Sequence, residues 1–396
     1  MIARRWGAGV AVGIALAACG PITEEQSAPS RAECSSASAF HASDVDPLKE
    51  LLIVDDRVMS DDAATNALAG PLSFRHAIEA ILPEGDDPAA AALEWLDGWA
   101  PAALRCDWLR ARPENACDAS CGTCADREVD LAHAPFRLIA VANRLDLGES
   151  GEQNAEGRLL FGATDGPGDD PRSPSLPVTV IFEFRLAGAP HEWAARWHAL
   201  GGPGEVDGAW VLSLTEVTKQ FVRSEDFGQV RVHDASGTRG VMYEFHLDAN
   251  AKRLVRAGLR RTPAHSMNDS AVLHDFARSN DEAILSDRYE LPGWMLTDRI
   301  ELGETWTLPG IDEPLRRAFA QGTCDGCHGR EHPTTDGGFH VSPRRRGAEK
   351  LSRFLFDPEH REEDELSRRA AVLARVDGLR CSQELVPASA RSSRAE

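Results

Sequence analysis

Apolar residues recur along this chain with two different periods, and together these periods predict a mixture of helices and strands. Spacings of three or four residues are typical of a helix with one buried face, and they occur over residues 74–82, 88–99, 191–200 and 210–222. Alternating or continuous apolar runs are typical of strands, and they cover residues 136–142, 158–161, 178–186, 229–233 and 241–247. The last run is the clearest, because Val241, Tyr243 and Phe245 alternate with more polar positions. The pattern predicts an α+β fold with a mixed, largely antiparallel sheet and packed helices.

A second group of helices is predicted near the carboxyl end. Asp312 and Pro314 mark a helix start, since an acidic cap and an early proline are both typical of that position. A last helix is predicted from Glu362, with an apolar stripe that continues to Val376. We therefore expect an α+β body at residues 34–305, a small and mostly α-helical module at residues 308–382, and a flexible tail at residues 383–396.

The first residues have the features of a secretory signal. Arg4 and Arg5 precede an apolar run that ends at Ala18, and this run is shorter than the about 20 apolar residues of a membrane-spanning helix. The string Leu16-Ala17-Ala18-Cys19 looks like a bacterial lipobox. We expect a lipoprotein signal peptide at residues 1–18, lipidation of Cys19 and a solvated tether at residues 19–33. Cleavage at an ordinary signal-peptidase site is the alternative.

The residues around Cys19 also indicate a location and a kind of partner. No aspartate follows Cys19 directly, which by resemblance to sorted lipoproteins favours a lipid anchor in the outer membrane of the cell envelope. The chain carries a formal net charge of −20. Strong acidity keeps a protein soluble and repels polyanions, so it argues against nucleic acid as a partner.

The cysteine count points to disulfides in an oxidising compartment. The chain has nine cysteines, and setting Cys19 aside leaves an even number, as expected of an exported protein. Four of them, Cys106, Cys117, Cys121 and Cys124, form a cluster that predicts a disulfide-rich loop at residues 106–124. A zinc knot is the alternative for this cluster.

The remaining cluster is Cys324-Asp325-Gly326-Cys327-His328. A Cys-x-x-Cys-His string is the attachment motif of c-type haem, because two thiols form thioethers with the vinyl groups and the next residue places an imidazole under the iron. We therefore expect a covalent haem c, bound by Cys324 and Cys327 and ligated by His328. A Cys324–Cys327 disulfide, a redox-active dithiol and a metal site are the alternatives.

The other axial ligand of such a haem is not a methionine, because no methionine follows Met295. His332 lies only four residues after His328, on the same side of a continuing helix, and is a poor candidate. His340 and His360 have enough chain to reach the other side, and His340 lies between two apolar residues. We expect His340 as the second iron ligand. The alternatives are another donor or an open iron site, with His340 an ordinary buried histidine.

Several segments resemble those of a known group of proteins. A strand that ends in Asn143-Arg144-Leu145-Asp146 and the late string from Thr323 to Gly329 resemble an uncharacterised family of exported bacterial lipoproteins with a carboxyl-terminal Cys-x-x-Cys-His segment. The resemblance covers residues 130 to 376 and implies that body and motif occur together, without implying a reaction. By itself, the Asn-Arg-x-Asp string fits a salt bridge or turn better than a binding site. Residues 308–382 resemble a small class I cytochrome c module.

Two functions follow from these observations. The first is a membrane-anchored lipoprotein that carries one covalent haem c and transfers electrons to a redox partner protein, with a peroxidase-like activity as a lesser option. The second is a haem-free, disulfide-stabilised surface scaffold or binding lipoprotein. The chain contains no nucleophile elbow, phosphate-binding loop, dinucleotide fingerprint or zinc-protease helix, so no hydrolase or transferase activity is predicted.

Overall fold

The computed structural model describes residues 40–384, apart from 67, 69, 118–123, 151–154 and 249. The compact unit spans Ala39–Arg380. The expected signal peptide, the lipidated Cys19, the tether and nearly all of the expected tail lie outside the described residues. Within the part that is described, no helix combines the length and the apolar character needed to cross a membrane.

The centre of the unit is an antiparallel sheet. Within the described residues it has eight strands in the order β1-β4-β5-β6-β7-β8-β10, and β9 also pairs with β8. Their bounds are β1 Leu52–Ile53, β4 Phe136–Arg144, β5 Glu156–Thr164, β6 Ser175–Arg185, β7 Phe227–Asp234, β8 Val241–Asp248, β9 Arg253–Ala257 and β10 Arg299–Glu301. Every strand pairs with its neighbours in antiparallel register. The prediction of a mixed α+β fold with a largely antiparallel sheet is confirmed.

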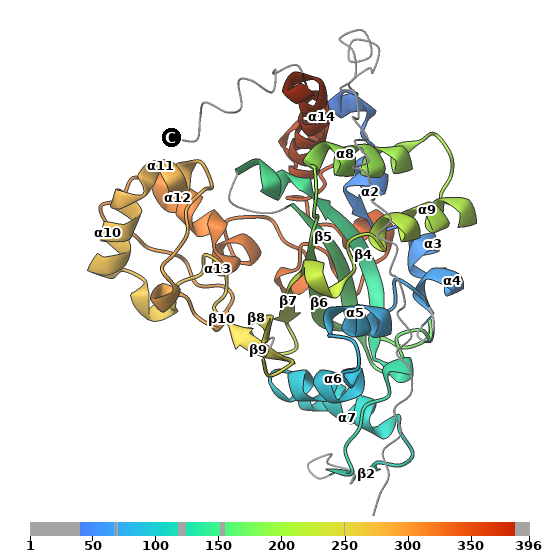
Figure 1. Ribbon diagram of the computed structural model, residues 1–396. Coiled ribbons are helices and arrows are strands. Elements are labelled where there is room, and N and C mark those ends of the chain that lie inside the picture. The colour runs from blue at the N-terminus through green and yellow to red at the C-terminus, as the bar shows by residue number, and fades with distance from the viewer. Residues whose placement is uncertain are drawn as a thin grey trace, which may run out of the picture. The chain divides into compact units, whose positions relative to one another are not determined.

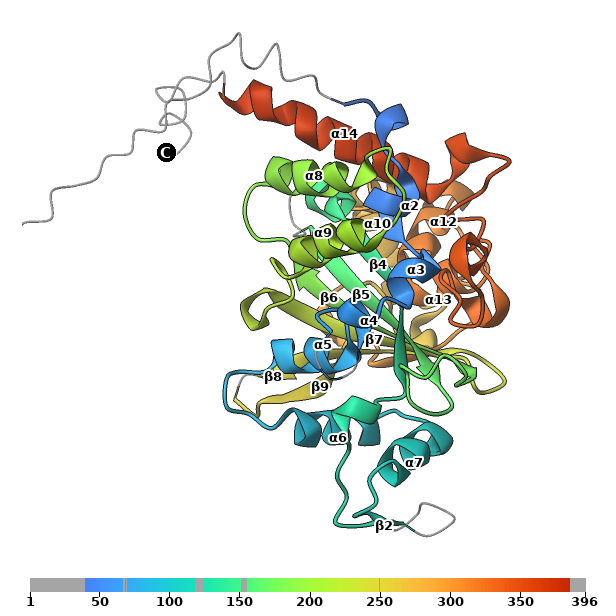
Figure 2. The same ribbon diagram turned by 90° about the vertical axis from the view of Figure 1, so that its right-hand side faces the viewer.

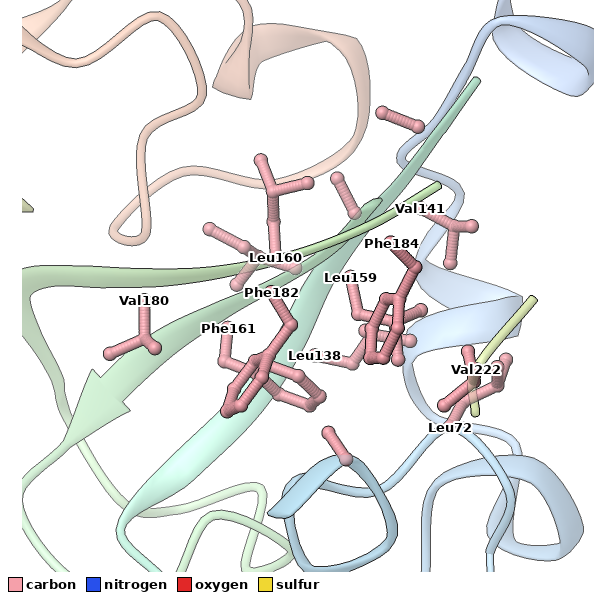
Figure 3. Close-up of a cluster of buried hydrophobic side chains, with 14 of the residues drawn as sticks. Leu72, Leu138, Val141, Leu159, Leu160, Phe161, Val180, Phe182, Phe184 and Val222 are labelled. Carbon is pink, nitrogen blue, oxygen red and sulfur yellow. The ribbon is translucent and has the colours of Figure 1, made fainter. Parts of the chain in front are cut away.

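The alternation of side chains gives the sheet two different faces. Phe161, Phe182 and Phe184 extend from one face into the main apolar core (Figure 3). The intervening positions of the same strands carry polar side chains, such as Arg158 on β5 and Glu183 on β6, to the other face. One face therefore forms the core, and the other is available for a polar site.

Helices lie on both faces of the sheet. Their bounds are α2 Pro47–Glu50, α3 Asp56–Met59, α4 Asp62–Thr65, α5 Phe74–Ile81, α6 Pro88–Asp97, α7 Ala102–Arg110, α8 Pro190–His198, α9 Gly208–Thr218, α10 Ala271–Ser279, α11 Asp281–Leu285, α12 Glu313–Gly322, α13 Cys324–His328 and α14 Glu365–Glu384. Helices α5, α8 and α9 lie on the core face, and α10 to α13 lie across the sheet from them (Figures 1 and 2). Side-chain caps from Ser73, Asp87 and Asp207 fix the starts of α5, α6 and α9.

The structure does not show the expected cytochrome c-like module at residues 308–382. The apolar side chains of α12, such as Phe319, pack with Tyr289 and Trp306 in one cluster. Those of α14, such as Leu366 and Leu373, join the main apolar core. The apolar stripes of this segment were predicted correctly. A stripe does not specify what it packs against, and in the structure packing partners such as Tyr289 belong to residues 34–305.

The predicted disulfide-rich loop lies largely outside the described side chains. Its backbone forms a short hairpin, in which β2 Ala116–Cys117 pairs with β3 Cys124–Ala125 and residue 117 faces residue 124. Cys106 is buried on α7. The disulfide pattern of residues 106–124 therefore stays a prediction.

Candidate cofactor site

The Cys-x-x-Cys-His segment forms its own short helix, α13. The Thr323 side chain caps it by accepting a hydrogen bond from the Gly326 amide at 3.0 Å, and its hydroxyl donates to the Ala320 carbonyl at 2.7 Å. A Cβ atom on Gly326 would lie 1.9 Å from that carbonyl oxygen. The turn between α12 and α13 therefore requires glycine at the third position of the motif.

Hydrogen bonds from distant segments hold the motif in place. The buried Asp325 carboxylate accepts the Gly303 amide at 2.7 Å and lies 3.2 Å from His265 Nε2. The Cys324 amide donates to the Thr262 hydroxyl at 2.9 Å. These contacts fix the motif helix against the segment between β9 and α10 and against the loop that follows β10.

The His328 ring has a defined protonation state. Its Nδ1 lies 3.0 Å from the Gly338 carbonyl oxygen, and a carbonyl can only accept, so Nδ1 carries the proton and Nε2 keeps its lone pair. Burial lowers the pKa of His328 to about 4, so the ring is neutral at physiological pH. A hydrogen bond of this kind is the usual orienting contact of a metal-bound histidine.

His340 comes close to the motif from a separate segment. Its Nε2 lies 3.3 Å from Cys327 Sγ, and its Nδ1 lies 3.0 Å from the Ser352 hydroxyl. The ring centroids of His328 and His340 are 4.6 Å apart, and the ligand atoms of Cys327, His328 and His340 all lie within 4.8 Å of one another. The structure thus brings together the residues that the sequence singled out for iron and haem.

The two motif cysteines are free thiols. Burial raises the pKa of Cys324 above its usual value and raises that of Cys327 to about 12. Both sulfurs are therefore protonated at physiological pH and carry no charge. They are available for covalent attachment, whereas thiolate chemistry needs a further positive group beside them.

Both cysteines, His328 and His340 line one cavity of about 310 Å³, which we call the motif cavity. Much of the lining is apolar and comes from Leu52, Leu147, Leu160, Ile181, Met242, Phe339, Val341, Phe354 and Leu355. Six arginines complete it, namely Arg144, Arg158, Arg231, Arg260, Arg261 and Arg369. The cavity is thus suited to a ligand with a large apolar surface and acidic groups.

Most of these arginines already have carboxylate partners on the polar face of the sheet. Arg231 Nε donates to Glu244 at 2.9 Å, and Arg231 also lies 3.2 Å from Glu183. Burial works to raise the pKa of Glu244, but Arg231 and His246 outweigh it, and the pKa falls to about 2. Burial raises the pKa of Glu183 despite Arg158 and Arg231. Arg260 differs, since its nearest carboxylate, Glu156, is 3.8 Å away.

The Asn-Arg-x-Asp string at the end of β4 forms a salt bridge within its turn. Arg144 donates two hydrogen bonds to Asp146, at 2.9 and 3.0 Å, and Asn143 accepts the Leu145 amide at 3.0 Å. Arg368 of α14 donates to the same Asp146 at 2.9 Å. The salt-bridge interpretation of this string is confirmed, although Arg144 also reaches the motif cavity.

Sequence reasoning missed His233 on β7. Its side chain is buried and lines the motif cavity, its ring lies edge-on to His328 at 5.3 Å, and it packs on Phe339 at 4.2 Å. Burial, together with His328, lowers the pKa of His233 well below its usual value. The signal was the alternation of His233 with Val230 and Val232, which places it on the polar face of the sheet.

The other candidate histidines lie elsewhere. His332 stacks on Phe354 with ring centroids 3.9 Å apart. His360 is 59% exposed and pairs with Asp357 at 3.5 Å. Of the three histidines considered as second iron ligands, His340 alone belongs to the cluster formed with Cys327 and His328.

No protein-family model matches the chain, and neither the curated proteins nor the solved structures contain a significant match. The resemblance to a lipoprotein family therefore stays an expectation.

Proposed function

We propose that this protein holds a c-type haem covalently on Cys324 and Cys327, with His328 as the proximal ligand, and that it transfers single electrons. One observation carries the proposal. Two uncharged thiols and an imidazole with a free Nε2 open into the same cavity, while the Nδ1 of that imidazole is held by a backbone carbonyl. Bound there, haem c supplies one-electron exchange between ferric and ferrous iron.

The donor set and the cavity lining both fit this group. Two thiols and the adjacent imidazole are the donors that covalent haem requires. A porphyrin is a flat apolar disc with two carboxylates, and the motif cavity combines apolar side chains with arginines. Arg260 is the arginine best able to bind a carboxylate of the ligand, because its own acidic partner is the most distant.

His340 is the proposed second iron ligand. Ser352 orients its ring through Nδ1, which directs Nε2 towards the cluster. Cys327 Sγ, at 3.3 Å, is the present neighbour of that nitrogen. A thioether at Cys327 would have no proton to share with His340 Nε2, which would leave this nitrogen available to iron. Two imidazole ligands favour a lower reduction potential than a histidine and a methionine would.

The rest of the proposal concerns location and organisation. The lipobox at Cys19 favours a lipid anchor in the cell envelope, with the folded unit exposed to a redox partner protein. In place of an independent cytochrome c-like module, residues 308–382 supply the motif side of the haem site. The polar face of the sheet supplies its other wall, through side chains such as Arg231 and Met242.

A second candidate is a metal centre without porphyrin. The ligand atoms of Cys327, His328 and His340 lie within 4.8 Å of one another, which is a spacing that a single ion can bridge. Thiolate and imidazole ligands suit zinc or copper. In that case Cys327 would bind as a thiolate and release its proton to water, and Cys324 would stay a free thiol.

The test is to mature the full chain in a host that has the cytochrome c maturation machinery and to record its absorption spectrum. We expect a red protein with the sharp α band of ferrous haem c after reduction, and loss of that band in His328→Ala. The matched control is His360→Ala, because His360 is exposed and does not belong to the cluster of Cys327, His328 and His340. A colourless protein with one bound metal ion would favour the second candidate. A colourless, metal-free protein would leave the haem-free scaffold.

A further inference from the structure

A second cavity has no part in the proposed haem site. Its volume is about 640 Å³, and its lining includes seven basic and three acidic side chains. The chain as a whole has the opposite ratio, with 43 basic and 63 acidic residues. We call this site the arginine cavity and define it by Arg137, Arg172, the consecutive residues 344–346 and Lys350. Its size is in the range of small-molecule pockets, about 300–1,000 Å³.

Several of the basic side chains are already neutralised at the rim. Arg172 forms two hydrogen bonds of 3.0 Å with Asp170. Arg344 and Arg345 share Asp336, at 3.3 and 3.2 Å. These pairs leave Arg137 and Arg346 as the guanidinium groups of this definition without a carboxylate partner, and Lys350 lies close to both.

The positive charges of Arg137 and Arg346 have little compensation. Arg137 donates to the carbonyl oxygens of Gly168 and Asp170, at 2.9 and 2.6 Å, and neutral acceptors orient a guanidinium without cancelling its charge. The Arg346 side chain has no hydrogen bond or ion pair to any residue that the structure describes. Lys350 is 4% exposed and forms an ion pair with Asp56 Oδ1 at 3.2 Å.

The electrostatics of the group agree with this geometry. Burial, followed by repulsion from Arg346, lowers the pKa of Arg137. Burial also lowers the pKa of Lys350 despite the opposing effect of Asp56, and Arg137 and Arg346 add to the lowering. The three cations therefore repel one another, and an anion placed among them would relieve that repulsion.

We propose that the arginine cavity binds a phosphomonoester, a small organic molecule that carries one phosphate group. A phosphate has two negative charges and three terminal oxygens, which two guanidinium groups and an ammonium can share. Pro171 and Pro174 belong to the lining and are exposed, so they offer an apolar surface to the organic part. The proposal does not depend on haem, since none of these residues lines the motif cavity.

Isothermal titration calorimetry on the mature full-length protein tests this proposal, with phenyl phosphate, inorganic phosphate and phenol as probes at constant ionic strength. We expect saturable binding of phenyl phosphate, weaker binding of inorganic phosphate and none of phenol. Equal affinity for phenyl phosphate and inorganic phosphate would contradict the proposal that the ligand is a phosphomonoester, and would identify the free phosphate ion as the ligand. No binding of either phosphate would overturn the site.

Substitutions identify the cavity as the place of binding. Arg346→Ala should weaken phenyl phosphate binding about tenfold or more, the effect of losing a charge-assisted hydrogen bond. Arg353→Ala is the matched control, because Arg353 is 68% exposed and lies outside the cavity. Unchanged binding in Arg346→Ala, or an equal loss in Arg353→Ala, would contradict the proposal. Melting curves of both variants should match the wild type, because neither side chain supports the core.

Discussion

The two cavities differ in whether their arginines are paired with carboxylates. In the motif cavity, Arg144, Arg231 and Arg369 each contact a carboxylate at 3.0 Å or less. In the arginine cavity, Arg346 has no partner among the described residues and Arg137 is bound only to carbonyl groups. Desolvated charges are costly unless they are paired. The motif cavity, whose arginines are paired, therefore suits a mostly apolar ligand. The arginine cavity, which has unpaired guanidinium groups, suits an anion.

The largest effect is expected from removing Arg231, which holds the paired charges of the motif cavity together. Arg231→Met leaves Glu183 and Glu244 buried beside fewer cations, so the free energy of unfolding should fall by about 3–5 kcal/mol. Urea denaturation measures this loss. Arg239→Met is the control, because Arg239 pairs with Glu304 at an exposed site, and a change within about 0.5 kcal/mol is expected there. Similar values for the two variants would show that the buried network does not stabilise the fold.

The second effect is a pH dependence that arises from Glu244. Its pKa is about 2 in the folded protein against an ordinary value of 4.5, so its contribution to stability is full above pH 4.5 and is lost as the pH falls towards 2. The loss should amount to about 3 kcal/mol. The free energy of unfolding, measured between pH 5 and 2, should fall less steeply in Glu244→Gln than in the wild type. Parallel curves would contradict the assignment.

The third effect concerns the backbone of the motif helix. A Cβ atom at residue 326 would lie 1.9 Å from the Ala320 carbonyl oxygen, so Gly326→Ala should lower stability by about 2 kcal/mol or more. Gly202→Ala is the matched control, because no atom lies within 4 Å of the added carbon and its φ of −51° suits alanine. Thermal melting compares the two, and equal melting temperatures would rule out the close packing of α12 and α13.

The smallest effect on stability is expected in the arginine cavity. Arg346 is exposed and unpaired, so Arg346→Glu should change the free energy of unfolding by less than about 0.5 kcal/mol without ligand. With phenyl phosphate present, the melting temperature should rise in the wild type and stay constant in the variant. A rise of equal size in both would contradict the difference between the two cavities.

The fold and the two sites were accessible to sequence reasoning to different degrees. The main strands and the helices α5, α6, α8 and α9 were predictable, because each carries a complete apolar face. The strands β1 and β10 were missed, since Leu52–Ile53 and Arg299–Glu301 are too short for any period to appear. The cytochrome c-like module was expected from two apolar stripes, and the structure packs these stripes into different clusters.

The motif cavity and the arginine cavity illustrate the same limit. Cys324, Cys327 and His328 are adjacent in sequence, so their chemistry could be predicted, and His340 followed from a search for a second iron ligand. Arg137 and Arg346 are more than two hundred positions apart in the chain, and no local pattern relates them. A site assembled by tertiary contacts alone leaves no signal in a single sequence.

The central claim is that iron porphyrin is bound through the two sulfurs of the motif. Tryptic digestion of the matured protein, followed by mass spectrometry, tests it most directly. We predict that the peptide with Cys324, Cys327 and His328 carries the additional mass of one haem, and that Cys324→Ser and Cys327→Ser together remove it. The same peptide with unmodified or disulfide-linked cysteines, isolated from a host that matures other c-type cytochromes, would contradict the account.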